Sequence, residues 1–234
     1  LKGVEQPLVE VLPQLVGTAA PQRVQGIRIE HLLTMTAGLE YTSFDNYGAW
    51  VASPNWLVAA VEQPVVAVPG DEFIYSTGNT HLLGAAVTEA SGEPLPDFAN
   101  RVLFGPLGIA ARWDRDPQGY AFAGNNLAMS PRDLLRFGRL MAAGGVWAGR
   151  QLIPRSWIEA STRVYNDGWP ERYGAYGYHW WLPPGEPRLW LAAGFGSQLL
   201  VIEPESSVVV VVTSTLESKG ETWDRRVLER GIDI

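Results

Sequence analysis

The chain has 234 residues, a formal net charge of −7, a 46% share of hydrophobic residues and no cysteine. The lack of cysteine excludes disulfides, cysteine nucleophiles and thiolate metal sites. The acidic balance argues against a nucleic-acid partner, because phosphate binding needs clustered Lys and Arg. No apolar run approaches the length of a membrane span, and no internal repeat or linker divides the sequence, so we expect a single domain over residues 1–234.

Helices dominate the first two thirds of the expected structure. Residues 27–35 predict a short helix, and residues 81–90 place their apolar side chains at helical spacing before Gly92. Ser-Pro-Arg-Asp at 130–133 is a strong helix start, with a serine cap, a proline in the first turn and an acid three residues later. Gly144 and Gly145 predict the end of that helix.

Strands dominate the last third. The segments 176–182, 189–193, 198–202 and 207–214 are rich in Val, Trp and Tyr, and turn residues at 183–185 and 203–205 separate them. A last helix is expected at 222–228. Helices followed by an antiparallel meander predict an α+β fold with an antiparallel sheet flanked by helices.

Four segments stand out for their order along the chain. They are His-Leu-Leu-Thr-Met-Thr-Ala-Gly-Leu at 31–39, Tyr-Ser-Thr-Gly-Asn at 75–79, the helix start at 130 with Gly-Gly-Val-Trp after it, and Gly-Phe-Gly-Ser-Gln at 194–198. From composition alone, Tyr75 reads most simply as a half-buried core residue. A catalytic role would require its phenol at the mouth of a cleft, with its pKa lowered by a nearby cation.

Taken in order, these segments resemble the β-lactamase-related serine hydrolases, which include class C β-lactamases, DD-peptidases, esterases and 6-aminohexanoate-dimer hydrolases. The resemblance runs from about residue 25 to residue 214. The Tyr-Ser-x-Gly-Asn-x-His-Leu-Leu run and the Gly-Phe-Gly-Ser-Gln form of the last motif look most like the 6-aminohexanoate-dimer hydrolase branch. The resemblance implies acyl transfer through a serine ester, without a cofactor or a metal, on a small-molecule substrate.

The second motif of this family is similar to Tyr-Ser-Thr at 75–77. The resemblance assigns Tyr75 as the catalytic acid/base, with Ser76 and Asn79 as its neighbours in the motif. Thr77 stands where an amide side chain is usual, and a threonine cannot present the two donors of an amide. This departure counts against β-lactamase activity.

The third motif is similar to Gly194-Phe195-Gly196. The resemblance makes the Phe195 N–H an oxyanion donor and the two glycines points where the backbone approaches the substrate. The Lys or His that begins other versions of the motif is missing, since alanines occupy that region and Arg188 lies too far back; neutral esters or amides are therefore the expected substrates. Three aromatic residues of the 173–181 run are candidates for the cleft wall: Tyr178, Trp180 and Trp181.

The Ser-x-x-Lys pair of this family is absent. The chain contains two lysines, Lys2 and Lys219, and neither follows a serine at that spacing. In the family the nucleophile precedes the 31–39 segment, and this sequence opens on Leu-Lys-Gly-Val without a methionine. We therefore expect a domain truncated at its N-terminus, with the nucleophile upstream of Leu1 and with no activity in the isolated chain.

Three hypotheses about function follow. The leading one is a serine hydrolase for ester or amide bonds of small molecules. The alternatives are a catalytically inactive binding or sensor homologue and a penicillin-binding DD-peptidase or β-lactamase.

The three histidines, His31, His81 and His179, lack the spacing of a metal site and are expected to be structural. Ser197 lacks a recognisable His-Asp pair and is not expected to be a nucleophile.

Overall fold

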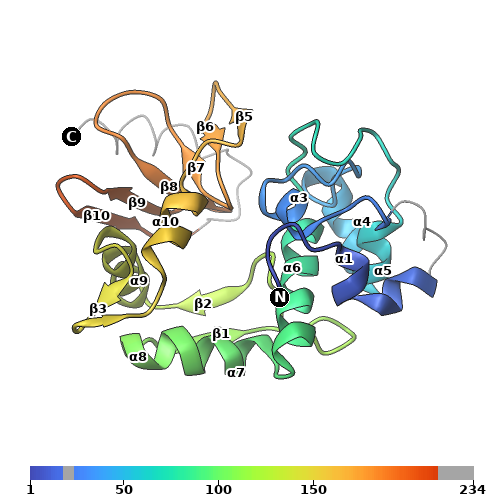
Figure 1. Ribbon diagram of the computed structural model, residues 1–234, viewed down its shortest axis with the longest axis horizontal. Coiled ribbons are helices and arrows are strands. Elements are labelled where there is room, and N and C mark those ends of the chain that lie inside the picture. Colours follow the sequence, from blue (N-terminus) through green and yellow to red (C-terminus); the bar gives the residue numbers. More distant parts are fainter. Residues whose placement is uncertain (18–23, 216–234) are drawn as a thin grey trace.

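The computed structural model describes residues 1–17 and 24–215, and these form a helical lobe and a sheet lobe (Figure 1). The expected helix at 222–228 lies outside the described residues. Helices and an antiparallel sheet occur together, so the predicted α+β class is confirmed. Among the described residues, no helix has the length and apolar character needed to cross a membrane.

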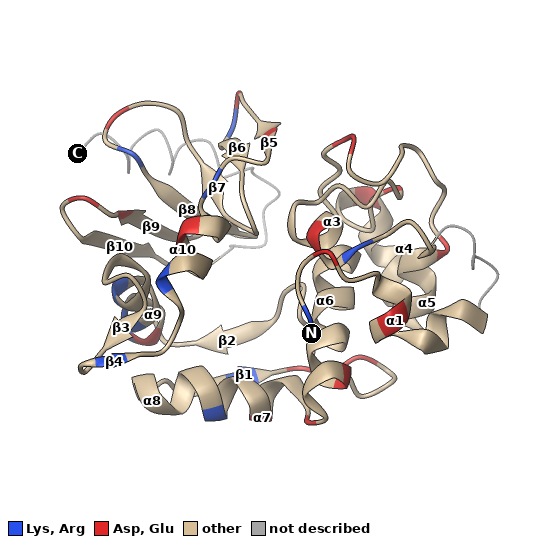
Figure 2. Ribbon diagram, in the orientation of Figure 1, with Lys and Arg blue, Asp and Glu red and all other residues tan. Residues whose placement is uncertain are grey.

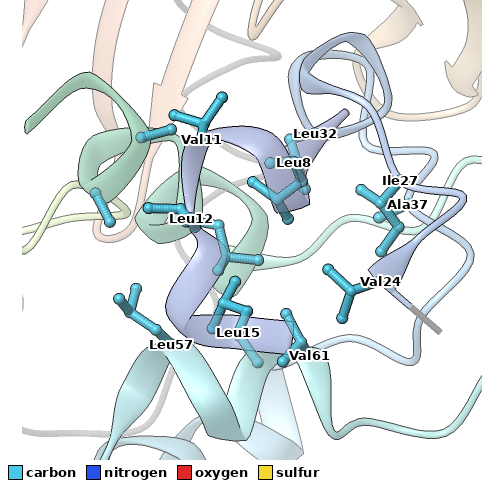
Figure 3. Close-up of a cluster of buried hydrophobic side chains, with 14 of the residues drawn as sticks. Leu8, Val11, Leu12, Leu15, Val24, Ile27, Leu32, Ala37, Leu57 and Val61 are labelled. Carbon is cyan, nitrogen blue, oxygen red and sulfur yellow. The ribbon is translucent and has the colours of Figure 1, made fainter. Parts of the chain in front are cut away.

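The helical lobe is built around one long helix, α6. The elements of this lobe are α1 (Leu8–Val11), η1 (Pro13–Gly17), α3 (Ile29–Leu33), η2 (Phe44–Asn46), α4 (Tyr47–Val51), α5 (Trp56–Val61) and α6 (Thr77–Ser91). α6 begins four residues before the predicted start and ends at Gly92, whose φ of 72° lies in the left-handed region. Side chains from α1, η1, α3 and α5 meet those of α6 in a buried apolar cluster (Figure 3).

A second group of elements follows α6 and connects the lobes. It comprises α7 (Leu95–Ala99), the π-helical turn η3 (Asn100–Phe104), α8 (Gly105–Leu107) and the paired strands β1 (Ala111–Trp113) and β2 (Leu127–Met129). In Figure 1 these elements run along the lower edge, with β2 leading from the helical lobe to the sheet lobe.

The sheet lobe holds a six-stranded antiparallel meander in the order β10-β9-β8-β7-β6-β5. Its strands are β5 (Asn166–Trp169), β6 (Gly174–Tyr176), β7 (Trp181–Leu182), β8 (Trp190–Gly194), β9 (Gln198–Glu203) and β10 (Val208–Val212). The prediction of one strand over 176–182 is wrong. The Gly177 N–H donates to the Trp180 carbonyl at 2.8 Å and His179 adopts a φ of 60°, so a tight turn divides this segment into β6 and β7.

The helix α9 (Pro131–Ala142) covers one face of the sheet, and its predicted start is confirmed. The Ser130 side chain accepts the Asp133 N–H at 3.1 Å, which caps the helix. Gly138 allows α9 to lie close to β9 and β10. The hairpin β3 (Val146–Trp147) and β4 (Arg150–Gln151) and the helix α10 (Arg155–Ser161) complete the lobe.

Side chains of the sheet alternate between two apolar clusters. Leu200, Ile202 and Trp190 face α9 and α10. Leu191 and Leu199 face the opposite way, where they join Met35 from the segment after α3. The second cluster therefore lies where the sheet meets the helical lobe. Successive side chains of a strand point to opposite faces, so neighbours along a strand enter different clusters.

Candidate functional site

Tyr75 stands directly before α6, in a segment fixed by contacts with a loop more than thirty residues earlier. The first N–H groups of α6 are capped by hydroxyls of that loop: the Thr77 N–H donates to Ser43 Oγ at 2.8 Å, and the Gly78 N–H donates to Thr42 Oγ1 at 2.7 Å. These bonds satisfy donors that would otherwise be orphaned at a helix start. Thr42 and Ser43 thus position Tyr75. Sequence reasoning missed these two residues, and the one sequence feature that could have pointed to them is their position just after the 31–39 segment.

Ser76 and Asn79, the predicted neighbours in the motif, are both buried. Ser76 Oγ accepts the Thr42 N–H at 3.1 Å, and the Ser76 N–H lies 3.5 Å from Met35 Sδ. The Asn79 side-chain amide points to the same sulfur at 3.8 Å. Both residues therefore hold the start of α6 against the segment after α3.

The ring of Tyr75 is half-buried and faces three other aromatic rings. It stacks on Trp181 of β7 with centroids 5.8 Å apart and an interplanar angle of 22°. Trp169 of β5 lies 5.5 Å away and Phe44 of η2 lies 6.2 Å away, both tilted. Tyr75 therefore lies at the junction of the two lobes, with Trp181, a predicted wall residue, against it.

The pKa of Tyr75 is raised, mainly by burial and then by the neighbouring Tyr173. This direction is opposite to the lowering that a catalytic base requires. Burial disfavours the charged phenolate, and no Lys or Arg of the described residues is among the groups that shift this pKa. At neutral pH Tyr75 is a neutral phenol, which can donate a proton but does not readily accept one.

Two of the aromatic residues predicted as cleft wall lie away from Tyr75. The Tyr178 hydroxyl donates to Glu30 Oε1 at 2.6 Å, and its ring stacks on Tyr165 with centroids 4.4 Å apart. Trp180 faces α9, parallel to Phe137 within 9°. The tight turn after β6 reverses the chain, so these two side chains leave the surface that Trp181 occupies.

The third motif forms the tip of the hairpin between β8 and β9. Gly194 pairs with Gln198, so Phe195, Gly196 and Ser197 make the turn, with Gly196 at a φ of 74°. The Phe195 side chain is 91% exposed, and its N–H donates to no acceptor within the described residues. Ala193, one residue before the motif, belongs to the same apolar cluster as Tyr75. The second and third motifs therefore border one cluster.

His81 anchors α6 one turn beyond the site. Its Nε2 lies 2.9 Å from Asp116 Oδ2, and neither side chain is exposed to solvent. Trp50, Trp56 and Phe122 enclose the imidazole. Burial lowers the pKa of His81, although hydrogen bonding to Asp116 opposes the shift. A neutral imidazole that donates from Nε2 to the carboxylate fits this setting, and His81 has the structural role expected of it.

Comparison with known proteins places the chain in a family. The family described as Beta-lactamase matches residues 3–231. The chain belongs to the β-lactamase family. A 6-aminohexanoate-dimer hydrolase of Paenarthrobacter ureafaciens is 24% identical to it over 237 aligned positions, which cover 90% of this chain and 59% of that protein.

Solved structures share the fold. A Bacillus anthracis protein described as a 6-aminohexanoate-dimer hydrolase matches with a TM-score of 0.76 at 22% identity, over 89% of this chain and 59% of that one. A D-stereospecific amidohydrolase from Streptomyces sp. matches with a TM-score of 0.66 at 18% identity, over 89% of this chain and 73% of that one. The chain thus spans about 59% of the length of the first two relatives.

Among the described residues of this β-lactamase-family chain, Lys and Arg lie mainly on the sheet lobe (Figure 2). Arg188 is exposed and donates to the Thr162 carbonyl at 2.5 Å, which directs it toward the end of α10. Arg172 lies over the rings of Tyr173 and Trp169, 4.9 and 5.7 Å from their centroids. Arg172 is therefore the cation of the described residues that borders the aromatic rings around Tyr75.

The described residues contain no group of three or more His, Cys, Asp or Glu side chains that could hold a metal ion. An open pocket lies between the end of α9, the β3–β4 hairpin and the β9–β10 turn, with Arg139, Trp147 and Ser207 in its lining. None of its lining residues belongs to the second or third motif, so it is separate from the candidate site.

Proposed function

We propose that this chain is part of a serine hydrolase that cleaves ester or amide bonds of small neutral molecules through an acyl-enzyme. The observation that carries the proposal is the position of Tyr75: the tyrosine of the second motif stands at the start of α6, in contact with the sheet and half-open to solvent. The family match over residues 3–231 supports this reaction class.

The nucleophile in this proposal is a serine outside residues 1–234, followed three residues later by a lysine. We place the serine outside these residues because neither of their two lysines, Lys2 and Lys219, follows a serine at that spacing. The serine oxygen attacks the substrate carbonyl carbon while its proton passes to the lysine amine. The leaving group takes a proton as its bond to carbon breaks. Water then cleaves the ester, which releases the acid and restores the serine.

Tyr75 supplies the proton to the leaving group in this proposal. Burial keeps its phenol protonated at neutral pH, which suits a donor. The tyrosinate left by this step would take a proton from the lysine ammonium, which had received it from the serine, so that Tyr75 and the lysine both return to their starting states. The Phe195 N–H, which donates to no described acceptor, would bind the oxygen that becomes negative in the transition state.

Neutral substrates are proposed because the third motif offers no cation. Ala192 and Ala193 precede Gly194, and Arg188 is engaged at the end of α10. A carboxylate entering a partly dry site would need a cation or several donors. Arg172 is the residue that could overturn this expectation, since it lies beside Trp169.

The test uses the protein encoded with its upstream residues. A fluorophosphonate probe should label one serine upstream of Leu1 stoichiometrically, and residues 1–234 alone should remain unlabelled. Tyr75→Phe should lower turnover of p-nitrophenyl butyrate by about 10²–10⁴-fold with little change in stability. A loss of less than about fivefold would show that Tyr75 is a packing residue.

Substrate class is tested by measuring kcat/KM for p-nitrophenyl butyrate and nitrocefin side by side. We expect a higher value for the neutral ester. A higher value for nitrocefin, lost in Arg172→Gln, would show that Arg172 provides the missing cation. Failure of every serine to label would favour the inactive binding homologue.

A further inference from the structure

Phe44 is an apolar side chain held in an exposed position. Its side chain is 57% exposed, although it lies among aromatic rings. Its centroid is 5.8 Å from Trp169, 5.9 Å from Tyr41 and 6.2 Å from Tyr75. Nothing in the sequence distinguished this residue, because two of these rings, Tyr75 and Trp169, lie far from it along the chain.

The backbone at Phe44 is strained. Its φ of 52° lies in the left-handed region, which large side chains rarely adopt. The flanking residues hold this conformation: Ser43 Oγ is bonded to Thr77, and the Asn46 side chain donates to the Tyr41 carbonyl at 3.0 Å. Strain that surrounding contacts maintain is concentrated at functional sites.

Phe44 and Trp169 come from opposite lobes and meet beside Tyr75. Phe44 belongs to η2 of the helical lobe, and Trp169 ends β5 of the sheet lobe. Trp169 continues the stack inward, because its centroid lies 5.1 Å from Trp181 at an angle of 23°. The result is an aromatic surface that begins at Phe44 in solvent and ends at the ring of the candidate catalytic tyrosine.

We infer that Phe44 and Trp169 form a specificity subsite that binds the linear apolar chain of the substrate next to Tyr75. The inference rests on the proposed function, because it takes Tyr75 as the reacting end of the chain. The rings of Phe44 and Trp169 offer a flexible alkyl chain apolar area to lie against, so the subsite selects apolar length, although Arg172 lies over Trp169 at 5.7 Å from its centroid. An exposed ring that gains burial when ligand binds also explains why Phe44 is held outward.

If the subsite binds an alkyl chain, the dissociation constant should depend on the length of that chain. Each methylene removed from water contributes about 0.8 kcal/mol, which corresponds to about a fourfold change in the dissociation constant. The dependence should end once the chain has passed the two rings.

The experiment measures binding in the full-length protein with linear 2-alkanones from 2-butanone to 2-octanone. These probes carry a neutral carbonyl and no scissile bond. Dissociation constants are obtained by titration of the indole N–H signals in NMR spectra. We expect the wild-type constant to fall by two- to fourfold for each added methylene over part of the series.

Phe44→Gly separates binding from folding. Glycine adopts a positive φ without strain, so the melting temperature should be unchanged or higher. The dependence on chain length should fall below about 1.5-fold per methylene, and Phe44→Leu should restore most of it. Phe98→Ala is the matched control, because Phe98 is a half-buried phenylalanine on α7 and should leave the series unchanged.

Equal chain-length dependence in wild type and Phe44→Gly would overturn the inference, as would a flat series in the wild type. The binding series and the fluorophosphonate labelling can fail separately, so they distinguish failure of the subsite from failure of the proposed function. A steep series in a protein that no fluorophosphonate labels would sustain the subsite and reject the hydrolase. Labelling with a flat series would do the reverse.

Discussion

Replacing His81 with phenylalanine removes one of the hydrogen bonds to a carboxylate that has no contact with solvent. Asp116 Oδ1 accepts the N–H groups of Gln118 and Tyr120, each at 2.9 Å, and Oδ2 accepts from His81 at the same distance. A phenyl ring suits the surrounding aromatic side chains but leaves Oδ2 without its partner. We therefore expect a loss of stability despite a gain in apolar contact.

The size of the expected stability loss depends on the protonation state of His81. Because burial lowers the pKa of His81, the imidazole is neutral at pH 7, and the bond is one to a charged acceptor and not an ion pair. Such bonds contribute about 1.5–3 kcal/mol, less than the 3–5 kcal/mol lost on breaking a buried salt bridge. For a chain of this size, a loss of about 2 kcal/mol lowers the melting temperature by roughly 4–8 °C.

Thermal and urea unfolding followed by tryptophan fluorescence measure this loss. The double variant His81→Phe/Asp116→Asn should be more stable than the sum of the single changes predicts, because the buried charge is then gone. A change of less than about 0.5 kcal/mol in His81→Phe, or simple additivity in the double variant, would refute the assignment of this bond as an anchor of α6.

The pH dependence provides an independent check. His81 has a lower pKa in the folded chain than its unfolded value of about 6.5. The unfolded chain therefore binds the proton more readily, and the stability present above pH 6.5 is lost as the pH falls below it. Since phenylalanine does not titrate, the difference in stability between wild type and His81→Phe should shrink on acidification below pH 6.5.

Three further predictions concern the sheet lobe. Gly138→Ala should destabilise by about 1–2 kcal/mol, because its Cβ would lie 2.5 Å from Val209 Cγ1; a higher melting temperature would contradict the close packing of α9. Burial lowers the pKa of His179 to about 4, so stability should fall between pH 6.5 and pH 4, and His179→Asn should flatten the pH dependence of the urea midpoint. Val208, 52% exposed on the edge strand β10 of the described sheet, pairs with Glu203; Val208→Lys should reduce association seen by light scattering, and unchanged scattering would show that this edge is not the contact.

Local signals in the sequence determined several elements directly. The Ser-Pro-x-Asp start of α9 and the glycine at the end of α6 satisfy or release backbone groups within one turn, so nearby residues suffice to predict them. The meander from β8 to β10 was equally readable, because hairpin strands that are neighbours in sequence pair with one another. The motif around Tyr75 likewise identified the family that the comparisons established.

The surroundings of Tyr75 were decided by tertiary structure alone. The turn that divides β6 from β7 is held by a bond from the His179 N–H to the Leu33 carbonyl, which lies in the other lobe. This turn directs Trp181 to Tyr75 and sends Trp180 to the opposite face. The pKa of Tyr75 depends on burial between the lobes, and Phe44 and Trp169 meet there from positions 125 residues apart. Contacts of this kind leave no periodicity in the chain, because each partner is chosen by the packing of whole elements and not by its neighbours in sequence.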